Sequence, residues 1–170
     1  ISACLVGSEM CIRDRDGISV IQTAEGALTE VHSILQRVRD LAVQAGSDSN
    51  NADSRTAIKT EIDSLGKELT RVAASTNFNG IKLLDSASTL TFQVGAGSDA
   101  DEDQIAVTLT DFSGLGARIE ALTVTDAAAA LTTIAALDTE IKGVSTARAG
   151  LGAVQNLSLI HISEPTRQAE

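Results

Sequence analysis

The amino-acid sequence predicts a mainly α-helical fold, an elongated antiparallel bundle of three long helices with a small β-hairpin region between the second and third helices. Three stretches place apolar residues at alternating steps of three and four, the spacing of one helix face. Another stretch alternates apolar and polar residues, as a half-buried strand does. Hydrophobic residues make up 43% of the 170 residues and aromatic residues only 2%. The core must therefore consist of Leu, Ile, Val and Ala, which suits helices packed side by side.

The first helix is expected over residues 18–45. Its main apolar row is Ile21, Ala24, Leu28, Val31, Leu35, Val38, Ala42 and Ala45. A second row beside it is Val20, Ala27, Ile34 and Leu41. A helix with two adjacent apolar rows normally packs against more than one neighbour. At 1.5 Å per residue this helix would be roughly 40 Å long.

The second helix is expected over residues 53–75, after a short polar loop that begins at Gly46. Its apolar row is Ile58, Ile62, Leu65, Leu69 and Val72. Two long helices joined by a short loop should lie antiparallel. The dipeptide Asn79-Gly80 then marks a turn that ends the helical region.

The β region is expected over residues 81–110. Two runs alternate apolar and polar residues and predict an antiparallel ribbon: Leu90, Phe92 and Val94 in the first, Ile105, Val107 and Leu109 in the second. The run 81–84 either adds a strand or packs without one. Residues 111–124 are expected to be irregular, because Gly114 and Gly116 break regular structure.

The third helix is expected over residues 126–150, with Thr125 or Asp126 as its N-cap. Its apolar row is Ala130, Ile134, Leu137, Ile141 and Val144, continued by Leu151. Strands and helices do not alternate along the chain, which argues against a nucleotide-binding sheet.

Residues 1–15 and 157–170 differ in composition from the rest of the chain. Both Cys, the one Met and the one Pro lie in these two flanks. The N-terminal flank has no basic region before its apolar residues, so it does not fit a signal peptide. We interpret both flanks as non-native sequence and assign the folded domain to residues 16–156.

Charge and motifs exclude several classes of function. The net charge of −10 disfavours binding to a nucleic-acid backbone, and no apolar run approaches the 18 residues of a membrane span. The acidic loop with Asp99, Asp101 and Asp103 does not fit an EF-hand, because position six is Gln104 instead of Gly. His32 has no second histidine at a zinc-binding spacing, so it is interpreted as an exposed helix residue. We therefore expect no enzyme activity, no cofactor, and no catalytic or metal-binding residue.

One helical surface remains as a candidate site. Gln36 and Arg37 lie beside Leu41, which makes a mixed polar and apolar patch on the first helix. Such a patch is typical of a recognition surface, since arginine beside aliphatic groups is common in interfaces. The periodicity alone is equally consistent with a solvated face held by contacts between residues three and four apart.

Several longer motifs resemble the conserved regions of bacterial flagellin. They are DGIS at 16–19, QTAEGAL at 22–28, LQRVRDLAVQ at 35–44, NFNGIKLL at 77–84, FQVG at 92–95 and ARAGLGAVQN at 147–156. The last of these is similar to the start of the family's C-terminal conserved region. The resemblance covers essentially residues 16–156.

The resemblance implies a structural subunit of the flagellar filament that self-associates through its helical rod for swimming motility. It also implies export through the flagellar apparatus and an extracellular location on the flagellum. The partners would be other flagellin subunits, the export apparatus and, in hosts, the Toll-like receptor for flagellin, with neither nucleic acid nor membrane. The family's receptor-facing patch falls on Gln36, Arg37 and Leu41, with Glu68 on the second helix; Asp40 stands where the family most often has Glu.

The sequence departs from the flagellin pattern in two ways, and two alternative functions are compatible with parts of it. The family's terminal helices would lie before Asp16 and after Asn156, where the flanks stand instead, and its variable outer domains are missing. We therefore expect the chain alone not to form filaments. A hook-associated junction protein is the first alternative, although the intact 35–44 motif disfavours it. A non-flagellar coiled-coil interaction module is the second, although it would not explain the turn at 77–80 or the ribbon.

Overall fold

The computed structural model describes residues 2–94, 97, 99 and 103–168, with side chains described between Arg15 and Leu159. Four helices form within these residues: α1 (Ser2–Ala45), α2 (Ala52–Ser75), α4 (Leu115–Glu120) and α5 (Ala127–Gln168). Four short strands lie between α2 and α4: β1 (Asn77–Phe78), β2 (Ile81–Lys82), β3 (Thr89–Gln93) and β4 (Gln104–Thr108). The mainly helical fold with small antiparallel strand pairs is confirmed.

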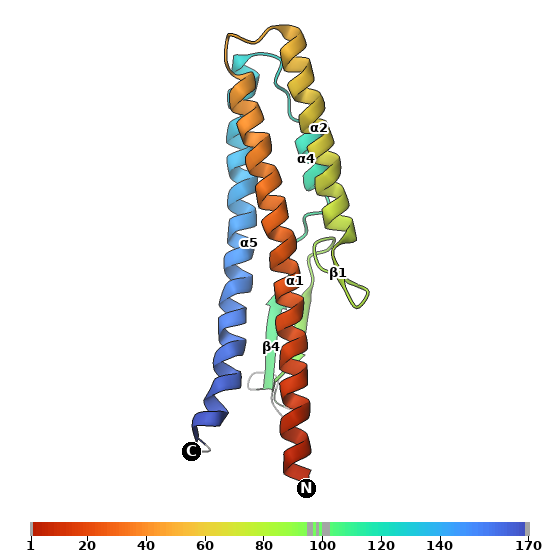
Figure 1. The fold of residues 1–170 in the computed structure, drawn as a ribbon, viewed down its shortest axis with the longest axis vertical. Helices are drawn as coiled ribbons and strands as arrows, with labels where there is room; N and C mark the ends of the chain where they lie inside the picture. Colours follow the sequence, from red (N-terminus) through yellow and green to blue (C-terminus); the bar gives the residue numbers. More distant parts are fainter. Residues whose placement is uncertain (1, 95–96, 98, 100–102, 169–170) are drawn as a thin grey trace.

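The long helices give the molecule the shape of a rod (Figure 1). α1 runs from one end to the other, and α2 and α5 both run back in the opposite direction. α1 packs against both of them, and the α1–α5 contact is the more extensive. α1 and α5 are longer than expected, because helix continues over residues 2–15 of the first flank and 157–168 of the second. The different origin of these flanks stays a prediction.

The core follows the main apolar row of α1. All eight residues of that row are at most 1% exposed. In the second row Val20 and Leu41 are buried, whereas Ala27 and Ile34 are partly buried. The wide stripe therefore serves two neighbours within the chain, α5 along one side and α2 along the other. No helix in the described part of the chain is long and apolar enough to cross a membrane.

Short polar side chains set the ends of the helices. The side chain of Asn51 accepts a hydrogen bond from the backbone N–H of Ser54 at 2.8 Å, which caps α2. Asp126 accepts one from the N–H of Ala129 at 2.8 Å, so it caps α5. Asn79 and Gly80 both have positive φ, 49° and 83°, and form the tight turn between β1 and β2.

The β3–β4 ribbon lies toward the end of the bundle at which the chain begins and ends (Figure 1). The two strands pair antiparallel with Phe92 opposite Ile105. β3 contacts α1 and β4 contacts α5, so the ribbon lies across the groove between the two longest helices. Leu83 and Leu84 are buried directly after β2, so the run 81–84 both forms a short strand and packs into the core.

The expectation that residues 111–124 are irregular is wrong for the part that forms α4. Leu115 and Ile119 are each 1% exposed and anchor this short helix on α2. Gly116 was expected to break structure but is the point of closest approach: a Cβ there would overlap the Gly66 carbonyl oxygen and the Thr70 hydroxyl. The glycine therefore lets two helix backbones touch. The bundle consequently has a fourth, short helix that packs against α2.

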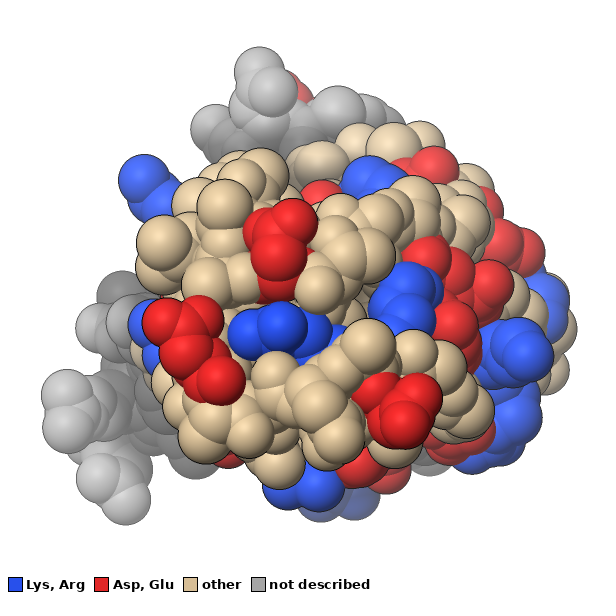
Figure 2. Space-filling model, turned by 90° about the horizontal axis from the view of Figure 1, so that it is seen from above, with Lys and Arg blue, Asp and Glu red and all other residues tan. Residues whose placement is uncertain are grey.

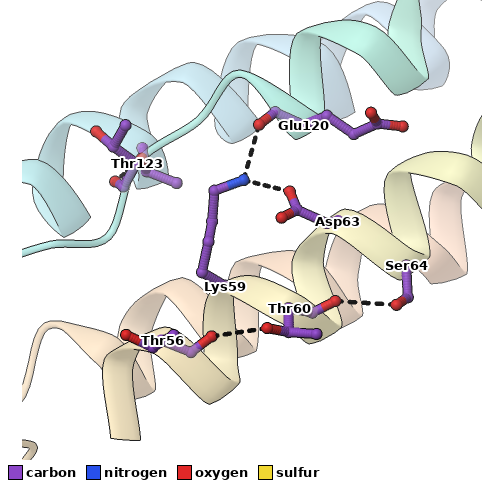
Figure 3. Close-up of polar contacts among 8 residues, drawn as sticks. Thr56, Lys59, Thr60, Asp63, Ser64, Glu120 and Thr123 are labelled. Atoms are coloured by element: carbon purple, nitrogen blue, oxygen red, sulfur yellow. Dashed lines mark hydrogen bonds and ion pairs between the residues drawn. The ribbon is translucent and has the colours of Figure 1, made fainter. Parts of the chain in front are cut away.

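A lysine ties α2 to the end of α4 (Figure 3). The Nζ atom of Lys59 donates a hydrogen bond of 2.7 Å to the carbonyl oxygen of Glu120, and it also pairs with Asp63. Backbone carbonyls at a helix C-terminus lack partners inside the helix, and a cation there stabilises the end. Lys59 therefore provides a hydrogen-bond partner for a backbone carbonyl at the C-terminal end of α4.

Candidate interaction surface

The predicted patch lies on the face where α1 and α2 run side by side. Arg37 projects from α1 and donates two hydrogen bonds to Oε1 of Glu61 on α2, from Nε at 3.0 Å and from Nη2 at 2.7 Å. The side chains are 57% and 44% exposed, respectively. An exposed pair of this kind contributes about 1 kcal/mol or less to stability. Its main consequence is to hold an arginine and a carboxylate together at the surface.

The other predicted residues on α1 occupy different environments. Gln36 is exposed, and its Nε2 lies 3.5 Å from Nε2 of His32. Leu41 is only 2% exposed and belongs to the core, so in the isolated chain it supports the patch from beneath. His32 is half-buried, not exposed as expected, and its Nδ1 is buried without a hydrogen-bond partner among the described residues.

Glu68 lies two helical turns from Glu61 on α2 and is not in contact with Arg37. It forms an ion pair with Arg71, three residues further along the same helix. A shallow groove of about 490 Å³ separates this pair from α1, where it is lined by Thr29, Ser33 and neighbouring residues. The structure thus joins Arg37 to Glu61, a residue that the sequence analysis missed, because only the register of α1 against α2 shows which carboxylate faces the arginine.

Acid should reduce the contribution of the Glu68–Arg71 pair to the stability of the folded chain. The hydrogen bond from Arg71 holds the pKa of the Glu68 carboxyl below its ordinary 4.5. A carboxyl group whose pKa is lower in the folded state stabilises the fold when the pH is above its unfolded-state pKa. This stabilisation is lost as the pH falls through the folded-state pKa. We expect Glu68→Gln to lower the urea midpoint at pH 7 but not near pH 2. Asp85→Asn, which removes an exposed carboxylate, serves as the control; equal pH profiles for both variants would contradict the prediction.

Positive and negative side chains alternate over the end of the rod that carries the α1–α2 connection (Figure 2). A groove of about 350 Å³ there is lined by Arg55, Lys59, Val124 and neighbouring residues. Arg55 donates hydrogen bonds to the carbonyl oxygens of Ala45 at 3.0 Å and Ser47 at 3.2 Å. Its guanidinium group thus holds the α1–α2 connection in place.

The acidic loop between β3 and β4 lies only partly within the described residues, and Asp101 lies outside them. The Oδ2 atom of Asp103 accepts a hydrogen bond from the backbone N–H of Asp99 at 3.1 Å. Within the described ranges, no group of three or more His, Cys, Asp and Glu side chains is placed to hold a metal ion.

The chain is similar in sequence to flagellins. The family model described as the bacterial flagellin N-terminal helical region matches residues 8–89. A flagellin of Halalkalibacterium halodurans is 44% identical over 143 residues, which is 84% of this chain and 52% of the relative. Flagellin B of Vibrio cholerae is 48% identical over 94 residues, 54% of this chain and 25% of the relative. The chain thus spans about half the length of the first relative and a quarter of the second.

The fold is similar to solved structures as well. The crystal structure of Bacillus cereus flagellin superimposes with a TM-score of 0.77 at 31% sequence identity, covering 89% of this chain and 86% of that one. The structure of FliC from Burkholderia pseudomallei gives a TM-score of 0.66 over 82% of this chain and 99% of the other, and at 21% identity it supports the fold alone. With the motifs, the buried rows and both kinds of similarity in agreement, this chain belongs to the bacterial flagellin family.

Proposed function

We propose that the chain is part of a structural subunit of the bacterial flagellar filament, exported to the cell exterior and used for swimming. The observation on which this rests is the similarity to Bacillus cereus flagellin over 89% of the chain. A filament wall needs a stiff subunit, and a rod whose main apolar row is fully buried provides one. The role proposed for this chain is therefore mechanical.

Self-association requires surfaces that the single chain leaves uncovered. The exposed large apolar side chains among the described residues are Val43, Ile81, Leu131, Leu157 and Leu159. A filament grows when each subunit offers two different patches that fit each other without closing into a ring. Leu131, which is 68% exposed on α5, is the most accessible of these side chains and a candidate contact to a neighbouring subunit.

Immuno-electron microscopy of cells that produce the protein tests this proposal. Antibodies raised against the purified chain should label flagellar filaments along their whole length. Label confined to the junction between hook and filament would favour a hook-associated protein instead. Filaments that remain unlabelled would contradict both assignments.

We also propose that the α1–α2 surface is the part recognised by the host Toll-like receptor for flagellin. The family resemblance assigns this role to Gln36, Arg37, Leu41 and Glu68, and the pairing of Arg37 with Glu61 supports adding Glu61. An arginine held beside a carboxylate offers a partner a donor and an acceptor in a fixed arrangement.

Replacing Arg37 should reduce receptor signalling with little loss of stability. We expect Arg37→Ala to raise the protein concentration needed for half-maximal receptor signalling about tenfold, because arginine is often a dominant interface residue. Arg118→Ala is a matched control: its side chain is 51% exposed and pairs with Glu140, but it lies on α4. A reporter-cell assay compares the two variants. Equal potencies would contradict the assignment. Arg55 is a poorer control, because it supports the α1–α2 connection.

A further inference from the structure

Among the described residues, no further strand lies beside the outer edge of β4 in the β3–β4 ribbon. In the described part of the chain this sheet has two strands only. Hydrogen bonds from Val94 N–H to the Asp103 carbonyl and from Leu109 N–H to the Ser88 carbonyl, both 2.8 Å, fix which β4 residues bond to β3. Hydrogen-bonded and non-bonded pairs alternate in an antiparallel ladder. The backbone groups of Ala106 and Thr108 therefore point away from β3, and Thr108 lines a groove together with residues of α5.

A groove of about 520 Å³ runs between this edge and α5. Gly143, Ala147 and Gly150 line it at successive turns of the helix. Glycine inside a helix costs about 1 kcal/mol relative to alanine. A Cβ on Gly143 or Gly150 would meet nothing in this chain within 4 Å. The packing of this chain therefore does not need either glycine, but their small size keeps the floor of the groove low enough for another backbone.

The lining of the groove is mostly apolar and carries one positive charge. Lys142 is the one charged residue of the lining. The hydroxyls of Thr139 and Thr146, which also line the groove, donate hydrogen bonds to backbone carbonyls of α5 itself. Among the described residues Lys142 forms no ion pair, although the chain has a net charge of −10. A lone, uncompensated ammonium group attracts an occupant that brings a carboxylate.

We propose that this groove binds an extended acidic peptide segment of a partner protein, which adds to the free edge of β4 as a third strand. The backbone groups of Ala106 and Thr108 would bond to the segment, as in other cases of strand addition. Its carboxylate would pair with Lys142, and the small residues of α5 would allow it to lie flat. This binding does not depend on filament formation, so it can be measured on the unassembled chain.

Nuclear magnetic resonance titration tests the proposal with a defined probe, a blocked hexapeptide of alternating valine and threonine with one central glutamate. The amide signals of Ala106 and Thr108 should shift with the probe concentration. Lys142→Glu should weaken binding at least tenfold, and Gly143→Leu, which raises the floor, should abolish it. Lys67→Glu makes the same charge change on α2 and should leave the affinity unchanged. Circular dichroism checks that all three variants keep the fold.

Three results would overturn the proposal. The first is the absence of shifts at millimolar peptide. The second is equal affinity for a probe with lysine in place of glutamate, since the pairing with Lys142 would then be wrong. The third is concentration-dependent shifts of the same amides without any peptide, which would assign the groove to a second copy of the chain. None of these results bears on the labelling of filaments.

Discussion

Replacing Gly116 with alanine should lower the free energy of unfolding by about 3 kcal/mol, the upper part of the range for overpacked sites. The added Cβ would overlap the carbonyl oxygen of Gly66 and the hydroxyl of Thr70, and it would lie 3.0 Å from the Thr70 backbone nitrogen. Two of these atoms belong to the backbone of α2, so a side-chain rotation cannot relieve the overlap. The helices must separate, and Leu115 and Ile119 lose part of their burial.

Urea unfolding followed by circular dichroism measures this effect. The control is Gly26→Ala on α1, where a Cβ would meet nothing within 4 Å. Alanine favours a helix over glycine by up to about 1 kcal/mol, so this variant should be more stable than the original chain. The same substitution should therefore have opposite signs at the two positions. A loss below about 1 kcal/mol for Gly116→Ala would show that α4 is not held closely against α2.

The same glycine explains the main difference between the sequence prediction and the fold. The long helices could be predicted because their apolar rows repeat over many turns, and each residue of the main row in α1 is buried. α4 is six residues long, too short to establish a period, and it contains a glycine. Glycine disfavours a helix locally but permits contact between backbones, and only the presence of Gly66 opposite Gly116 shows which effect prevails.

The candidate surface was predictable only in part, for a related reason. Periodicity and resemblance placed Gln36 and Arg37 on an exposed face of α1, where the structure also has them. The pairing of Arg37 with Glu61 depends on the axial position of α2 relative to α1. Apolar rows determine which helix faces meet. They do not determine how far one helix is shifted along the other, and shifts of a helical turn or more remain compatible with them. The short α1–α2 connection and the hydrogen bonds from Arg55 contribute to fixing it.

The packing of α5 against α1 leads to a second large effect, for Leu137→Ala. Leu137 is fully buried in the core cluster, and truncation of a buried leucine costs about 3 kcal/mol because it leaves a cavity. Leu131→Ala changes the same residue type on the same helix at a position that is 68% exposed. Its expected effect is within about 0.5 kcal/mol. Urea unfolding of both variants compares a buried with an exposed leucine at equal helix propensity.

The shape of the unfolding transition adds information to its midpoint. The residues that α1 buries against α5 and against α2 belong to one core cluster, so loss of the α1–α5 contact should also expose residues under α2. We therefore expect Leu137→Ala to shift a single cooperative transition, with helicity and the burial of Phe112 near α4 lost together. An early separate transition, with α2 and α4 still folded, would mean that α5 docks as an independent element. A rod built in that way would bend at the α1–α5 contact under load, which would contradict the mechanical role proposed for the chain.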